Sequence, residues 1–144
     1  MNDTAQETPI AATPLDDAQR MSVPAALFGV MFTTRVEPYV FGIARSLSAD
    51  YAGGYWEFYA LSSGGFYMAP AADEDTYQVR CENGYQGEMS GDALGVTCCL
   101  YAYSHLSFAG PDALAEECAR QYHLLREWML SGHAEARAIL AATD

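Results

Sequence analysis

Residues 51–70 read YAGGYWEFYALSSGGFYMAP, and this stretch determines how the chain around it can fold. Seven of its twenty residues are aromatic, and two Gly-Gly pairs divide it. Aromatic residues favour strands, whereas glycine supplies the positive φ angles of tight turns. The stretch therefore predicts a β-hairpin, whose strands YWEFYAL and GFYMAP are joined by an SSGG turn.

The two strands have an apolar face and a mixed face, because successive side chains of a strand point to opposite sides. The apolar set is expected to face helices as core and comprises Trp56, Phe58, Phe66 and Met68. The other set is expected to look outward and comprises Tyr55, Glu57, Tyr59 and Tyr67. Two interpretations of the outward face stay open. It is a contact surface rich in tyrosine, or its tyrosines form cross-strand pairs that only support the sheet.

The segments around the hairpin predict an α+β fold. TYQVRCE, from Thr76 to Glu82, alternates like a third strand, so a three-stranded antiparallel meander is expected. About four to five helices should cover it, including helices over 37–48, after Ser90, after Gly110-Pro111 and near the C-terminus. We expect a flexible tail over residues 1–20 and a single domain over 21–144.

Composition excludes several classes of protein. Nineteen acidic residues stand against seven arginines and no lysine, which gives a net charge of −12. Binding to a nucleic-acid backbone is therefore not expected, and no lysine is present to serve a phosphate loop or a Schiff base. The N-terminal residues lack the features of a signal peptide and no apolar run is long enough to cross a membrane, so a cytoplasmic location is expected. The four cysteines have no disulfide or zinc spacing and should be buried, reduced thiols.

No motif for catalysis, metal binding or cofactor binding is found, so we expect no enzyme activity, no metal and no cofactor. His105 falls on the apolar stripe of its helix with Leu94, Cys98, Tyr101 and Phe108, which favours a hydrogen-bonded core histidine. Acidic residues cluster only at 73–75 and at 116–117, and charged residues make up 18% of the chain, below the roughly 25% of ordinary domains. Such a sparse distribution argues against a surface that copies the dense charge of duplex DNA.

Several motifs resemble the ArdB/KlcA antirestriction family. They are the double Gly-Gly aromatic segment of residues 51–70, then NGYQGEMSGDALG from Asn83, and YHLLR in the next predicted helix. The resemblance runs from about Pro24 to the closing ILAATD. It implies a mixed helix and antiparallel-sheet domain from a plasmid or other mobile element. It also implies a protein that relieves type I restriction of unmodified incoming DNA without being an enzyme.

Two function classes are weighed for the candidate site. The first is an inhibitor that meets the type I restriction-modification system, directly or through a host factor; the second is a small ligand-binding domain or enzyme that uses the tyrosine face. The absence of an assembled acid, base and nucleophile favours the first. The oligomeric state, including a homodimer, stays open. Candidate interaction residues are Tyr51, Tyr55, Glu57, Tyr59, Asp73, Glu74 and Asp75.

Overall fold

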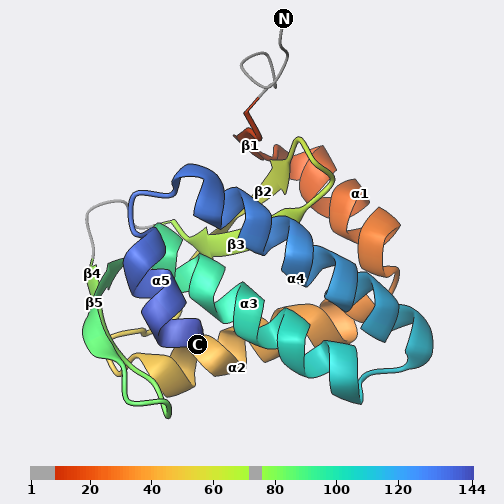
Figure 1. Ribbon diagram of the computed structural model, residues 1–144. Coiled ribbons are helices and arrows are strands. Elements are labelled where there is room, and N and C mark those ends of the chain that lie inside the picture. Colours follow the sequence, from red (N-terminus) through yellow and green to blue (C-terminus); the bar gives the residue numbers. More distant parts are fainter. Residues whose placement is uncertain (1–8, 72–75) are drawn as a thin grey trace, which may run out of the picture.

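Helix α3 (Gly91–Ala109) runs through the middle of the molecule, between α4 (Asp112–Gly132) and α2 (Glu37–Leu47), in the computed structural model (Figure 1). The structure describes residues 9–71 and 76–144. As predicted, α3 starts after Ser90, whose Oγ accepts a hydrogen bond from the Ala93 N–H at 3.1 Å. All residues from Ala93 to Leu100 are buried, so this helix has apolar contacts all round.

The predicted stripe on α3 is wrong at its C-terminal end. His105 and Phe108 are exposed, the latter by 88%, so this side of the helix faces solvent in its last turns. His105 does have the expected hydrogen bond, through Nδ1 to the hydroxyl of Tyr39 at 2.9 Å, but on the surface and not in the core.

The predicted hairpin is confirmed as strands β2 (Trp56–Leu61) and β3 (Phe66–Pro70), which pair antiparallel with Phe58 opposite Met68. A third strand, β1 (Ala12–Pro14), pairs with the other edge of β2. Helix α1 (Asp17–Phe28) follows it. The expected flexible tail is therefore wrong for residues 12–20, and residues 1–8 lie outside the described part.

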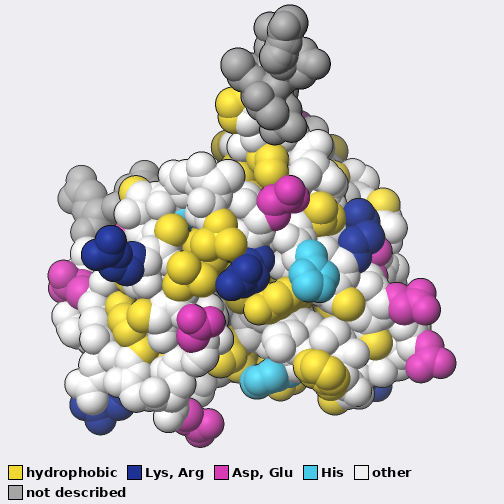
Figure 2. Space-filling model, in the orientation of Figure 1, with side chains coloured by type: hydrophobic (Ala, Val, Ile, Leu, Met, Phe, Trp, Pro, Cys, Tyr) yellow, Lys and Arg dark blue, Asp and Glu magenta, His cyan; other side chains and the backbone are white. Residues whose placement is uncertain are grey.

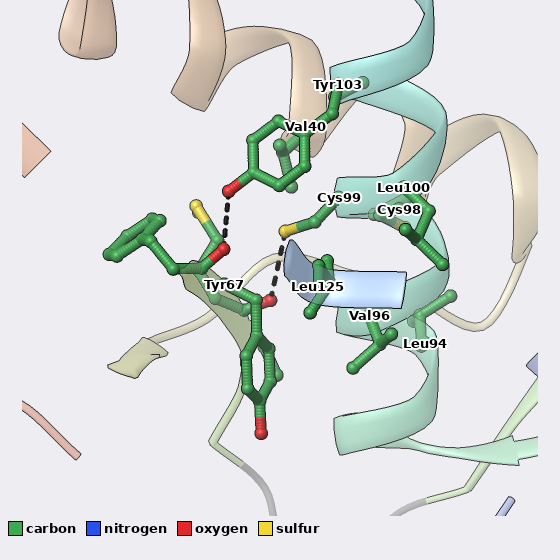
Figure 3. Close-up of a cluster of buried hydrophobic side chains, with 14 of the residues drawn as sticks. Val40, Tyr67, Leu94, Val96, Cys98, Cys99, Leu100, Tyr103 and Leu125 are labelled. Atoms are coloured by element: carbon green, nitrogen blue, oxygen red, sulfur yellow. Dashed lines mark hydrogen bonds between the residues drawn. The ribbon is translucent and has the colours of Figure 1, made fainter. Parts of the chain in front are cut away.

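Strand β4 (Thr76–Arg80) exists as predicted but pairs with β5 (Gln86–Ser90), so the expected meander with β3 is wrong. The reason is that α3 covers the outer edge of β3. There the carbonyl of Phe66 accepts from the Tyr103 hydroxyl at 2.6 Å, and the carbonyl of Met68 accepts from Cys99 Sγ at 3.7 Å (Figure 3). No strand can add at an edge that a helix already occupies.

Gly95 makes this close crossing of α3 and β3 feasible. A Cβ atom at this position would lie 2.4 Å from the Met68 carbonyl oxygen and 2.5 Å from the Ala69 Cα atom. The sequence DALG, which belongs to the motif that resembles the antirestriction family, thus sets the distance between helix and sheet.

The apolar face of the hairpin is buried as predicted, and Trp56, Phe58, Phe66 and Met68 are at most 4% exposed. Phe32 packs edge-on against Phe58 and Phe66, with ring centroids 5.6 Å from each. Phe32 begins a short π-helix, η2 (Phe32–Val36), between α1 and α2. These buried aromatic rings join the sheet to the core.

Helix α5 (Ala136–Thr143) completes an α+β fold of five α-helices, one π-helix and two small antiparallel sheets within the described residues. The prediction of an α+β single domain with four to five helices is confirmed. Within residues 9–71 and 76–144, none of the helices combines the length and the apolar character needed to span a bilayer.

Candidate functional site

The predicted outward face of the hairpin is largely covered. Tyr67 is only 2% exposed, because its ring stacks between Tyr59 of β2, at 4.7 Å between centroids, and Trp128 of α4, at 5.0 Å. Tyr59 and Glu57 are half-buried beside it. The expectation that Tyr67 looks outward is therefore wrong, since α4 lies over this face of β3.

A hydrogen-bonded network continues from Tyr67 into the helices. The Tyr67 hydroxyl donates to one oxygen of Asp92 at 2.7 Å, and His133 Nε2 lies 2.7 Å from the other. His133 Nδ1 accepts from the Glu135 N–H at 2.9 Å, so Nε2 holds the proton that is donated to Asp92. Burial, followed by the negative charge of Asp92, raises the pKa of Tyr67, which keeps the hydroxyl a donor.

Within the described residues this network contains no serine–histidine pair. Ser90 Oγ donates to the Glu135 carboxylate, and both ring nitrogens of His133 have other partners. A catalytic hydroxyl needs a base within hydrogen-bond reach, and Ser90 has none of the histidine type. The polar groups satisfy one another and join β3 to α3 and to the turn before α5, which is a structural role.

Tyr51 and Tyr55 lie on the other side of the sheet. Gly53 and Gly54 have φ angles of 93° and 115°, which most side chains avoid, and they turn the chain into β2. The Tyr51 hydroxyl accepts from Trp56 Nε1 at 3.0 Å. Tyr55 is 57% exposed, and its ring is covered by the guanidinium of Arg20 at 4.6 Å.

The predicted patch is thus divided in two. Arg20 also lies 4.0 Å above the ring of Phe58, which places Tyr55 on the side of the sheet that carries Trp56 and Phe58. Glu57 and Tyr59 belong to the opposite side with Tyr67. Tyr51 contacts Trp56, Tyr55 contacts Arg20 and Tyr59 contacts Tyr67, so the predicted aromatic residues do not form one surface.

The remaining predicted residues are Asp73, Glu74 and Asp75, and they lie outside the described residues. On the face shown in Figure 2, acidic and basic side chains are scattered and do not form a continuous acidic row. No group of three or more histidine, cysteine or acidic side chains within residues 9–71 and 76–144 is arranged to hold a metal ion.

The four cysteines are free and buried, as predicted. Burial raises the pKa of Cys99 and of Cys118 to about 12. They therefore remain thiols at neutral pH and behave as apolar core atoms, not as nucleophiles.

Sequence reasoning missed a second cluster, formed by Arg20 of α1 and Glu37 at the start of α2. Arg20 donates from Nη1 to the Trp56 carbonyl at 2.8 Å. One signal for it is present in the sequence, because Asp16 and Gln19 form a capping box with reciprocal bonds of 2.8 and 3.0 Å. That pattern predicts a helix from residue 17 and would have placed Arg20 on a helix and not in a tail.

The sequence and the α+β fold place the chain in a class of small proteins, the antirestriction proteins. The model of the family described as antirestriction protein matches residues 49–144, and the chain belongs to that family. The resemblance predicted from the motifs is confirmed.

Two relatives and a solved structure align with the chain over nearly its whole length. Two antirestriction proteins KlcA of Escherichia coli are 39% and 41% identical to the chain. The first alignment covers 96% of this chain and 98% of the relative, and the second covers all of both. A solved structure from work on KlcA and ArdB is 38% identical and superposes with a TM-score of 0.84 over all of both chains. Those two proteins are described as showing a novel fold and antirestriction activity against type I DNA restriction systems in vivo but not in vitro.

Proposed function

We propose that this chain relieves type I restriction of unmodified plasmid or phage DNA that enters the cell, and that it acts in the cytoplasm as an inhibitor and not as an enzyme. The observation that carries the proposal is the 38% identity, over the full length, to a structure from work on proteins with antirestriction activity against type I systems in vivo. Identity at this level over a common fold supports a common activity.

Binding, and not catalysis, is the proposed mode of action. The hydrogen bonds of the Tyr67 network join β3 to α3 and to the turn before α5, and no serine–histidine pair is among them, which supports a structural role for this network. The alternative of a ligand-binding or catalytic tyrosine face loses support, because Tyr59 stacks on Tyr67 beneath α4.

An indirect route through another component of the cell is favoured over direct mimicry of DNA. A mimic needs about one negative charge per 1.7 Å of duplex axis, and only 18% of this chain is charged. Activity of KlcA and ArdB in vivo but not in vitro also agrees with a requirement for something that purified components lack. The proposed contact is therefore between proteins.

Phage plating tests the proposal. Unmodified phage is plated on a strain with an active type I system, with and without the chain, and modified phage on the same strain serves as the control. We expect the unmodified phage to plate more efficiently when the chain is present, while the modified phage is unaffected. Equal plating of unmodified phage in both cultures, with the chain present and folded, rejects the proposal.

A further inference from the structure

The π-helix η2 lines a groove on the surface of the molecule. In η2 the N–H of Glu37 bonds to the carbonyl of Phe32, five residues earlier, in place of the usual four. Such turns are rare and occur frequently at functional sites, because they place side chains where an α-helix would not. Here Phe32 and Thr33 line a groove between α1, η2 and β2.

The groove has an apolar floor and two opposite charges. Its volume is about 280 Å³, and apart from Arg20 and Glu37 it is lined mainly by apolar side chains, including Met21, Pro24, Phe32 and Phe58. At its rim Met21 is 79% exposed. Large apolar side chains left in water around a groove are a feature of interaction sites.

Arg20 has unused hydrogen-bonding capacity in this groove. Its guanidinium is held over the rings of Phe58 and Tyr55, and Nη1 donates to the Trp56 carbonyl. A guanidinium has five N–H donors, and within residues 9–71 and 76–144 no side-chain acceptor pairs with Arg20. The cation is therefore fixed in place with donors to spare.

Glu37 is the complementary group. Its carboxylate has no hydrogen-bond or ion-pair partner within the described residues, although it lies close enough to Arg20 to feel its charge. Burial raises the pKa of Glu37, and the charge of Arg20 opposes that rise. Arg20 and Glu37 are half-buried, line the same groove and do not hydrogen-bond to each other. A ligand group in the groove can therefore bond to both.

We propose that this groove binds an extended segment of a partner protein, with an apolar side chain on the Phe32 and Phe58 floor and a main-chain amide between Arg20 and Glu37. The amide carbonyl accepts from Arg20, and the amide N–H donates to Glu37. A carboxylate would meet the charge of Glu37 and an ammonium group that of Arg20, so the neutral amide is the matching ligand. This inference rests on the proposed function, since it gives the site at which the chain meets its protein partner.

A titration followed by NMR tests the chemistry with a defined probe, N-acetyl-leucinamide. The amide signals of Ala25 and Thr33 should shift on addition of this probe to the parent protein. N-acetyl-leucine has the same side chain but ends in a carboxylate, and we expect it to bind about tenfold more weakly because of Glu37. Absence of binding by N-acetyl-leucinamide, or shifts that avoid the groove, would overturn the proposal.

Two variants sharpen the titration. Arg20→Gln removes the charged donor and should weaken the amide probe about tenfold, as expected for a lost hydrogen bond to an ion. Glu37→Gln keeps an acceptor but removes the charge, so N-acetyl-leucine should then bind nearly as well as the amide. Arg45→Gln on α2, which does not line the groove, is the matched control and should change neither affinity.

Phage plating then connects the groove to the function. Arg20→Gln should reduce relief of restriction, while Arg45→Gln retains it and both proteins melt like the parent. Full relief by a folded Arg20→Gln protein that has lost the probe would overturn the docking site and leave the proposed function intact. If the parent itself gives no relief, the proposed function fails, whereas the probe titration still decides the chemistry of the groove. Should Arg20→Gln not fold, Glu37→Gln and the parent carry the same test.

Discussion

Two clusters of aromatic and charged residues lie on opposite sides of the same hairpin, and they differ in how far their polar groups are satisfied. Around Tyr67, the Asp92 carboxylate, His133 and Glu135 all have partners within the protein. Around Arg20, one guanidinium N–H is used and Glu37 is unpaired within the described residues. A closed network stabilises the fold, whereas open donors and acceptors on a half-buried site are available for a partner.

The largest expected effect on the free energy of unfolding lies in the cluster around Tyr67. Tyr67→Ala removes a ring buried between Tyr59 and Trp128 and leaves one of the two Asp92 oxygens without its donor, so it should cost about 3–5 kcal/mol in free energy of unfolding. Chemical denaturation measures it. A cost below about 1 kcal/mol would show that the stack is not a structural element and would remove the contrast between the two clusters.

The contact of α3 with β3 gives the next effect. Gly95→Ala would place a methyl group 2.4 Å from the Met68 carbonyl oxygen and should cost about 1–3 kcal/mol or more, because both neighbours are backbone. Gly42→Ala is the matched control, since nothing lies within 4 Å of a Cβ atom there and the residue is inside helix α2. The control should be neutral or should stabilise by up to about 1 kcal/mol. Similar melting curves for the two variants would contradict the close crossing.

Only some of these structural features could be predicted from the sequence. The hairpin and its apolar face followed from alternation within residues 56–68, and α3 followed from Ser90 as a helix cap, because those signals are local. The pairing of β4 with β5 did not follow, since it depends on α3 occupying the edge of β3 through Tyr103 and Cys99. That contact joins residues more than 30 positions apart and has no local signal.

The predicted site is divided for both local and long-range reasons. Tyr55 and Tyr59 have the same parity in the sequence, but Gly54 has a φ of 115° just before the strand and breaks the alternation at Tyr55. Tyr67 was predicted to be exposed because its strand pattern is the same whether or not a helix lies over it. Arg20 and Glu37 were missed because α1 and η2 bring them to the same groove, and neither element was predicted.

The dependence of stability on pH tests the burial of Cys99, whose thiol contacts the Met68 carbonyl of β3. Burial raises the pKa of Cys99 to about 12, whereas a thiol in an unfolded chain titrates near about 8.5. Between these values the unfolded chain releases a proton that the folded chain keeps, so stability falls as the pH rises. The fall should be about 1.4 kcal/mol per pH unit for this thiol.

Cys99→Ala removes that contribution, and the slope of unfolding free energy against pH should become shallower by about one proton. The measurement is denaturation at several pH values under reducing conditions, so that oxidation of the other thiols does not interfere. An unchanged slope would mean that Cys99 ionises equally in the folded and unfolded chains, which its burial against the Met68 carbonyl argues against.

The smallest effect on stability is expected at Tyr55, which lies beside Arg20. Its ring is 57% exposed and touches the Arg20 guanidinium, so Tyr55→Ala should change the free energy of unfolding by about 0.5 kcal/mol or less. Tyr51→Ala should cost more, about 1 kcal/mol, because it leaves the Trp56 indole N–H without its acceptor.

Tyr55→Ala, which should affect stability least, is expected to have a large effect on antirestriction activity. If the side of the sheet held by Arg20 meets a partner, Tyr55→Ala reduces relief of restriction several-fold in a protein that melts like the parent, because aromatic contacts at the centre of an interface contribute most of its binding energy. Phe108→Ala is the matched control, since that ring is 88% exposed at the far end of α3 and belongs to neither cluster. It should leave both melting and plating unchanged. Equal loss of relief in the Tyr55 and Phe108 variants would show that exposed aromatic area in general, and not the side of the sheet held by Arg20, determines the activity.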